Sequence, residues 1–335
     1  MFLANGLIDR NHKVRLLIYK GEFSKNKFRL FVRKTWLKIL YPNAVNCLGQ
    51  FKGKVETFEE INRCDFQKDE IVIATGIWSC REINKLHNSE IRKIHNIRGQ
   101  IPWEKDLMKQ AWSEDVPKVA VASYLKETVR EICNLEVSAV IPNGVDTSRY
   151  YPSVPESQRD GIGTIYHLSY HKDPEIVLSV LGKLQDVCCN VPQRVFGVSR
   201  RPGTLTRNSY ARYPSVEKAR DIYSRSMVWI MASRSEGFPN PVLEAMACGC
   251  AVVATDCGGS RDIITDGENG FLAEVGNTNE IVDKVKLLLN NPDLREKMVA
   301  NARETVIKFS WKNSFDKWEE FLKRIVNNKR IEQSA

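Results

Sequence analysis

The sequence predicts an α/β protein made of two doubly wound parallel sheets in tandem, and three observations support this fold class. Apolar runs of strand length alternate with amphipathic helical stretches along the chain. The runs are continuously apolar, which is typical of parallel strands covered on both faces. A turn-rich segment interrupts the alternation near the middle, and 335 residues suffice for two domains of ordinary size.

The first half of the chain predicts one domain. Strand-like runs occupy residues 14–19, 71–75, 93–97 and 119–123, and a helical pattern covers 124–133. The following Ile141-Pro142-Asn143-Gly144 and two further prolines are typical of turns and loops. We therefore expect an N-terminal Rossmann-like domain over residues 1–142 and a linker over 143–160.

The second half repeats the alternation. The expected strands are residues 164–169, 195–198, 228–232, 251–255 and 271–273. The expected helices are residues 216–226, 241–247, 279–290, 293–308 and 311–327. This pattern predicts a second Rossmann-like domain over 161–310 and a C-terminal helix and tail over 311–335. Domains of this type bind ligands at the carboxyl ends of their strands.

The composition excludes several classes of protein. Hydrophobic residues make up 42% of the chain, which excludes an intrinsically disordered protein. The nine cysteines show no metal-ligand spacing and are interpreted as reduced thiols. No signal peptide and no apolar run of about 18 residues are found. We expect a soluble, cytoplasmic protein.

The net charge of +9 is concentrated at the N-terminus, where residues 1–50 contain ten basic and two acidic residues. From Lys25 to Leu40 the lysines and the apolar residues, including Trp36, fall on different sides of a helix. Such a helix could contact the inner face of a membrane peripherally, or it could pack on its own domain. Nucleic-acid binding is not favoured, because no recognised nucleic-acid motif accompanies the charge.

Residues 233–276 contain the most informative segment. A strand is expected to end at Ala232, and Asn240-Pro241 favours a helix start with Asn240 as N-cap. The free amides at such a start attract anions, and a diphosphate is the natural ligand class. Gly237 allows close approach of the backbone, and the available amides are those of Val242 and Leu243.

Two carboxylates flank this expected anion site, Glu236 before the turn and Glu244 one turn into the helix. They would repel a phosphate but could accept hydrogen bonds from hydroxyl groups on either side of it. A nucleotide sugar offers that arrangement, with a sugar, a diphosphate and a ribose. The alternative is a pair of solvent-exposed glutamates at a helix start.

The spacing Glu236-x7-Glu244 resembles the E-x7-E signature of glycosyltransferase family 4 (group 1), whose members are retaining GT-B enzymes. Residues 141–152, 266–277 and 291–311 also resemble segments of that family, so the resemblance extends from about residue 118 to 325. It implies the GT-B fold, in which two Rossmann-like domains face a cleft and the C-terminal helix crosses back to the N-terminal domain. It implies transfer of a sugar from a nucleotide-diphosphate sugar to a glycan or lipid-linked acceptor, with retention of configuration.

The resemblance also implies roles for individual residues. Glu236 and Lys172 would be catalytic, with Glu236 on the donor sugar and Lys172 neutralising the leaving phosphate. Glu244 would bind the ribose. The remaining donor-binding residues would be Gly237, Phe238, Pro239, Asn240, Val242, Leu243 and His167. Neither a metal nor another cofactor is expected, and no Asp-x-Asp pair lies in a suitable loop.

One position departs from the family pattern. The family has a Gly-Arg pair before the lysine, whereas this chain has residues 166–169, Tyr-His-Leu-Ser. Arg200, Arg201 or Arg207 could replace the missing guanidinium. The alternative for His167 is a structural histidine at the edge of the core that does not contact the donor. His171 is interpreted as a surface residue.

Other contacts follow less directly from the resemblance. Contacts to the base or phosphate are expected around residues 210–216, with Arg200 and Tyr213 as candidates. On the acceptor side, His95 and Arg98 stand at the end of a predicted strand. A core histidine is the alternative for His95.

The resemblance begins inside the family's first helix. The family's first strand and Gly-rich turn precede that helix, so we expect the first strand of the N-terminal domain to be missing. Either the coding frame continues upstream or the N-terminal sheet is short by one strand.

Two other functional classes remain as alternatives. A catalytically impaired GT-B scaffold that binds a ligand or partner is suggested by the departure at 166–169 and the missing first turn. A nicotinamide or flavin oxidoreductase would need G-x-G-x-x-G, and the nearest match, Gly161-Ile162-Gly163, has no third glycine.

Overall fold

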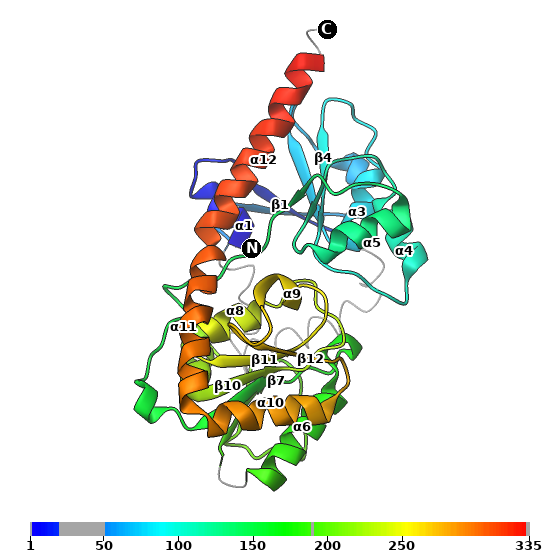
Figure 1. The fold of residues 1–335 in the computed structure, drawn as a ribbon. Helices are drawn as coiled ribbons and strands as arrows, with labels where there is room; N and C mark the ends of the chain where they lie inside the picture. The colour runs from blue at the N-terminus through cyan, green and yellow to red at the C-terminus, as the bar shows by residue number, and fades with distance from the viewer. Residues whose placement is uncertain (1, 20–50, 189–190, 333–335) are drawn as a thin grey trace. The chain divides into compact units, whose positions relative to one another are not determined.

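The computed structural model describes residues 2–19, 51–188 and 191–332, with side chains as far as residue 327. The chain forms two compact units, one of residues 1–141 with 315–335 and the other of residues 142–314 (Figure 1). The segment from Lys25 to Leu40, where a basic amphipathic helix is predicted, lies outside the described residues.

The described strands of the first unit form two parallel sheets. In the smaller sheet β1 (Arg15–Tyr19) pairs with β2 (Lys54–Phe58), which the sequence analysis had not predicted. The larger sheet has the order β3-β4-β5-β6. Its strands are Ile71–Thr75, Arg92–Ile97, Lys118–Ala120 and Ala139–Val140. The described residues therefore show a sheet in two parts, and the missing first strand stays a prediction.

Helices cover both faces of the larger sheet (Figure 1). On one face lie α3 (Ile77–Asn84), α4 (Lys105–Trp112) and α5 (Tyr124–Cys133). The other face receives α12 (Trp311–Glu332), which belongs to the first unit from Phe315 onward. Trp318 and Phe321 of α12 are buried and pack against Ile94 and Val119 of the sheet. This apolar contact fixes the C-terminal helix on the first unit.

The second unit is built on one six-stranded parallel sheet of order β12-β11-β10-β7-β8-β9. Its strands, from β7 to β12, are Gly161–Ile165, Gln193–Gly197, Tyr210–Arg212, Ser226–Met231, Ala251–Thr255 and Phe271–Ala273. The chain builds the sheet outward from β7 in one direction and from β10 in the other. The direction of winding therefore changes between β7 and β10, and ligands of doubly wound sheets bind at such a point.

Strand β7 starts at Gly161, three residues earlier than the sequence predicts. The reason is close packing. A Cβ atom on Gly163 would lie 2.6 Å from the ring of Trp229 in the neighbouring strand β10. Gly163 thus allows the fully buried Trp229 to pack against β7, although in a sequence the two glycines of this strand resemble loop residues.

The helices of the second unit are α6, α7, α8, α9, α10 and α11. Their bounds are Pro174–Val187, Val216–Arg225, Asn240–Ala247, Ser260–Ile263, Thr278–Asn290 and Pro292–Lys308. Residues 143–160, expected as a linker, are integrated into this unit. The amide of Val145 donates to the carbonyl of Phe309 at 2.9 Å, and the amide of Ser153 to Oγ of Ser224 at 3.0 Å.

Arg159 anchors the same segment beneath α8. Its guanidinium is buried and donates to the carbonyls of Cys248 at 2.6 Å and Gly249 at 2.8 Å, at the C-terminal end of α8. Glu156 pairs with its Nε at 3.1 Å. A cation at this end of a helix stabilises the unpaired carbonyls and opposes the helix dipole.

We expect Arg159→Met to lower the free energy of unfolding by about 2–3 kcal/mol, because it leaves buried carbonyls without donors. Urea unfolding measures the effect. Arg130→Met is the control, since Arg130 has a half-exposed side chain that pairs with Glu127 and Glu136 at the surface. It should cost less than about 1 kcal/mol. Equal midpoints for wild type and Arg159→Met would contradict the anchoring role.

Candidate functional site

Two loops lie side by side at the carboxyl ends of β7 and β10. The first covers residues 166–173 and contains a short 3₁₀ turn, Tyr170–Lys172. The second covers residues 232–239 and leads into α8. The carbonyl of His171 accepts the amides of Arg234 at 2.9 Å and Ser235 at 3.2 Å, so the backbone joins the two loops.

The two loops bring Lys172 and Glu236 together. The ammonium of Lys172 donates to Oε1 of Glu236 at 2.6 Å, although 64 residues separate them in the chain. Ser233 donates its hydroxyl to the same oxygen at 2.6 Å. The carboxylate of Glu236 is buried and the side chain of Lys172 remains partly exposed. A buried carboxylate beside a solvent-accessible cation can accept from one ligand group while the cation binds another.

His167 and His171 lie beside this pair, with ring centroids 6.4 Å apart. Nδ1 of His167 accepts the amide of Ser169 at 2.9 Å. Burial, followed by the charge of Lys172, lowers the pKa of both histidines below 6.5. At pH 7 both rings are therefore neutral, so Lys172 supplies the positive charge of this loop.

Arg234 and Asp173 belong to the same site, and the sequence analysis missed both. Oδ2 of Asp173 binds Nε of Arg234 at 2.9 Å, and the guanidinium lies 4.9 Å from the ring centroid of Tyr170. Asp173 is also the N-cap of α6, with a left-handed φ of 47°. The sequence signal was available, because Asp173-Pro174 is itself a helix start directly after Lys172.

The start of α8 differs from the prediction in two ways. Asn240 is the first helical residue and not the N-cap, because its Oδ1 accepts the side-chain amide of Asn143 at 3.0 Å. The N-cap is Pro239, which makes no side-chain cap. The amide of Val242 already donates to the carbonyl of Pro239 at 3.0 Å. The predicted pair of free amides from Val242 and Leu243 is therefore wrong for Val242.

Two other predicted donor-binding residues lie in the turn before α8. Gly237 is partly exposed, whereas Phe238 is buried. The ring of Phe238 packs against Phe309 with centroids 5.7 Å apart. Phe238 therefore anchors the turn through its contact with Phe309, and its side chain contributes to the core of the second unit.

Glu244 faces two tyrosines. Its Oε2 accepts the hydroxyl of Tyr223 at 2.9 Å, and Tyr150 is a second side-chain donor. Burial raises the pKa of Glu244 to about 7, and the two tyrosine donors act in the opposite direction. The alternative of a solvent-exposed glutamate is thus wrong, and a ribose hydroxyl would bind a carboxylate that already accepts from tyrosine hydroxyls.

Arg200 and Tyr213 lie on the other side of β7 from Glu236. Arg200 is exposed in the loop between β8 and β9. Tyr213 follows β9, has a left-handed φ of 50° and donates its amide to the carbonyl of Gly197 at 2.8 Å. The loop that contains Arg200 reaches the site through Ser199, whose hydroxyl accepts the amide of Leu168 at 3.0 Å.

His95 is a core histidine, so its predicted place on the acceptor side is corrected. It is fully buried, and its Nε2 lies 2.9 Å from Oδ1 of Asn84 on α3. The inward direction follows from strand alternation, which places His95 on the face covered by α3. Arg98, just beyond β4, has an exposed side chain.

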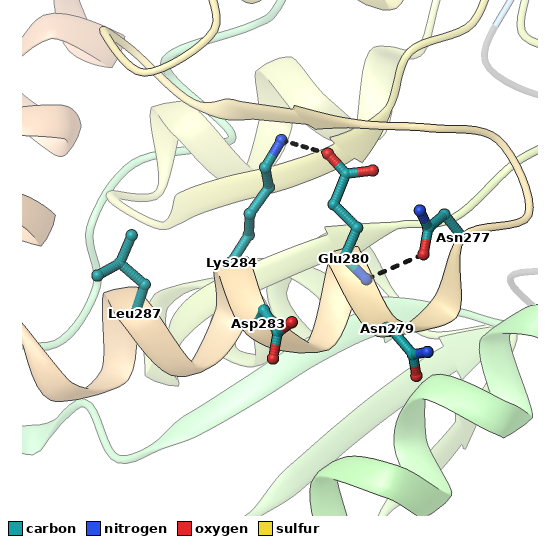
Figure 2. Close-up of a pocket in the computed structure, with 6 residues that line it drawn as sticks. All are labelled: Asn277, Asn279, Glu280, Asp283, Lys284 and Leu287. Carbon is teal, nitrogen blue, oxygen red and sulfur yellow. Dashed lines mark hydrogen bonds and ion pairs between the residues drawn. The ribbon is translucent and has the colours of Figure 1, made fainter.

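A surface hollow of about 430 Å³ lies along α10, away from these loops. Figure 2 shows that its lining side chains come from α10 and its N-cap: Asn277, Asn279, Glu280, Asp283, Lys284 and Leu287. Lys284 pairs with Glu280 at 2.8 Å and also donates to the carbonyl of Leu272. Oδ1 of Asn277 accepts the amide of Glu280. These groups hold α10 to β12.

Two further observations concern the described part of the chain. In residues 2–19, 51–188 and 191–327, whose side chains are described, no group of three or more His, Cys, Asp or Glu could hold a metal ion. Over the same ranges, the helices lack the combined length and apolar character that crossing a bilayer requires.

Comparisons with known proteins identify the family of this chain. Residues 209–305 match the family model of glycosyl transferases group 1. The N-acetyl-alpha-D-glucosaminyl L-malate synthase of Bacillus anthracis is 34% identical over 91% of this chain and 83% of that protein. An uncharacterized glycosyltransferase of Methanocaldococcus jannaschii is 45% identical over 24% of this chain. That match and two others cover only 23% to 29% of the relatives' own lengths.

A solved structure shows the same fold. Anabaena HepE in complex with UDP and glucose has a TM-score of 0.70 and 14% identity, over 93% of this chain and 100% of that chain. The predicted fold class of two Rossmann-like α/β domains is confirmed. With 34% identity over nearly the whole chain, this protein belongs to the glycosyl transferases group 1 family and has the GT-B fold.

Proposed function

We propose that the protein transfers a sugar from a nucleotide-diphosphate sugar to a glycan or lipid-linked acceptor, with retention of configuration and without a metal ion. The observation that carries this proposal is the Lys172–Glu236 pair, where the direction of winding changes between β7 and β10. Family membership supports the reaction class. A nucleotide and a sugar named with the solved structure are consistent with the donor class.

In this proposal each group acts on one part of the donor. Glu236 accepts hydrogen bonds from sugar hydroxyls near the reacting carbon, and Lys172 binds the leaving phosphate. The start of α8 faces the diphosphate. Glu244 exchanges its tyrosine partners for the ribose hydroxyls.

The chemical step balances without another reactant. The bond between the anomeric carbon and the phosphate oxygen breaks, and the acceptor oxygen bonds to the same carbon on the same face. The proton of the acceptor hydroxyl passes to the departing phosphate. Lys172 stabilises the charge that develops on that phosphate, and this is where a fixed cation lowers the barrier most.

The test compares a nucleotide with its sugar conjugate. Calorimetry with UDP, GDP, ADP and their glucose and N-acetylglucosamine conjugates identifies the pair that binds most tightly. Glu236→Gln should weaken binding of the nucleotide sugar about tenfold relative to the nucleoside diphosphate, because in this proposal Glu236 binds the sugar and Lys172 binds the phosphate. Glu296→Gln, an exposed glutamate on α11, is the control.

The outcomes separate the candidate functions. If Glu236→Gln weakens both ligands equally, the proposed role of Glu236 is wrong. If none of the nucleotides binds the wild type, the catalytically impaired scaffold is the better interpretation. Transfer should persist in EDTA, and NMR of the product should show the anomeric configuration of the donor.

A further inference from the structure

A pair of buried hydroxyl groups lies behind Glu236. Ser233 and Thr255 are each 2% exposed. Ser233 precedes Glu236 by three residues in the loop after β10, and Thr255 is the last residue of the adjacent strand β11. Both residues therefore lie at the carboxyl edge of the sheet, beneath the candidate site.

Thr255 holds the backbone of Ser233 at two points. Its hydroxyl accepts the amide of Ser233 at 3.0 Å and donates to the carbonyl of Ser233 at 2.6 Å. Cys257 adds a longer contact from its Sγ to the same carbonyl, at 3.5 Å. Because one side chain binds both backbone groups, Ser233 is fixed relative to β11.

Ser233 in turn holds Glu236. Its hydroxyl donates to Oε1 of Glu236 at 2.6 Å, the oxygen that also receives the ammonium of Lys172. Hydrogen bonds to an ionised acceptor are short and strong. The contacts thus run from the rigid strand β11 through Thr255 and Ser233 to the carboxylate.

The two donors to Glu236 differ in what happens when the donor substrate binds. On the proposed function, Lys172 turns to the leaving phosphate and its contact with Glu236 weakens. Ser233 has no phosphate to bind and is anchored by Thr255, so it keeps the carboxylate in place. A carboxylate that must meet sugar hydroxyls needs such support, because small displacements of a reacting group are costly.

We propose that Ser233 is the positioning residue for Glu236, and that Thr255 positions Ser233. This inference rests on the proposed function, since it gives Glu236 the sugar as its ligand. Neither hydroxyl touches the substrate. Both act through the orientation of Glu236.

The experiment uses the nucleoside diphosphate and nucleotide sugar that the calorimetric panel selects. Ser233→Ala should weaken the nucleotide sugar about tenfold and leave the nucleoside diphosphate unchanged, because a hydrogen bond to a charged group is lost. Thr255→Val should do the same. Ser233→Thr and Thr255→Ser keep the hydroxyls and should restore most of the affinity.

The control is Ser226→Ala, which removes another buried hydroxyl in the same unit. Ser226 is fully buried and donates to the carbonyl of Ile222 at 2.8 Å, away from Glu236. A merely structural effect would lower the melting temperatures of Ser233→Ala and Ser226→Ala. It would not change the ratio of their affinities for the nucleotide sugar and the nucleoside diphosphate. In turnover assays, Ser233→Ala should lower kcat more than it raises KM.

The failures are distinguishable. If Glu236→Gln separates the two ligands but Ser233→Ala and Thr255→Val do not, the positioning role is wrong and the proposed function stands. If Glu236→Gln fails to separate them, the proposed role of Glu236 is wrong and the positioning role of Ser233 fails with it. Should Ser233→Ala not fold, Thr255→Val and Ser233→Thr decide the question.

Discussion

Replacing Lys172 by methionine should lower the rate of sugar transfer by about 10²–10³-fold. The effect is that of removing a fixed group that stabilises developing charge in the transition state. Methionine keeps the length and the apolar stem of the side chain but removes the ammonium. The departing phosphate then develops its charge without a cation from the loop after β7. The two histidines of that loop are neutral at pH 7, so they cannot replace the lost ammonium.

The measurement is steady-state release of the nucleoside diphosphate, with a thermal melt to show that the variant is folded. Lys218→Met is the matched control, because Lys218 is exposed on α7, where it pairs with Asp221. Its turnover should stay within about twofold of the wild type. Turnover of Lys172→Met close to that of the wild type would remove Lys172 from the mechanism.

Acidification should destabilise the first unit through His95. Burial, then the charges of Lys118 and Lys93, lower the pKa of His95 to about 3, from the usual 6.5. Between pH 6.5 and 3, His95 is therefore protonated in the unfolded chain but not in the folded chain. Stability falls as the pH decreases through this window, by several kcal/mol at about 1.4 kcal/mol per pKa unit.

His95→Gln should flatten this pH dependence, because glutamine can still bond to Asn84 and does not titrate. Urea unfolding at pH 7 and pH 4.5, with hydrogen exchange of β4 as the local readout, measures the difference. His87→Gln is the control, since His87 is exposed. If wild type and His95→Gln lose the same stability on acidification, protonation of His95 does not drive it.

The sequence predicted most of the second unit because its elements are encoded locally. The runs at 251–255 and 271–273 coincide with β11 and β12, and continuous apolar character is the mark of a buried parallel strand. The start of α8 near Asn240 followed from Pro241. Strands β2 (KVETF) and β9 (YAR) were missed because both contain charged residues and neither is a continuous apolar run. The start of β7 was predicted too late because Gly161 and Gly163 resemble loop residues, and the packing partner of Gly163, Trp229, is distant in the chain.

The candidate site, too, was predicted only in part from the sequence. Glu236 and Glu244 were candidates because of their spacing and the turn chemistry around them, and Lys172 because of the family resemblance. Their partners could not, because hydrogen bonds between residues 20 to 100 positions apart leave no local pattern. Only the tertiary structure joined Lys172 to Glu236, turned Glu244 toward Tyr223 and bound Asn240 to Asn143. It also placed His95 in the core and Thr255 behind Ser233, because burial and long-range pairing depend on which strands become neighbours.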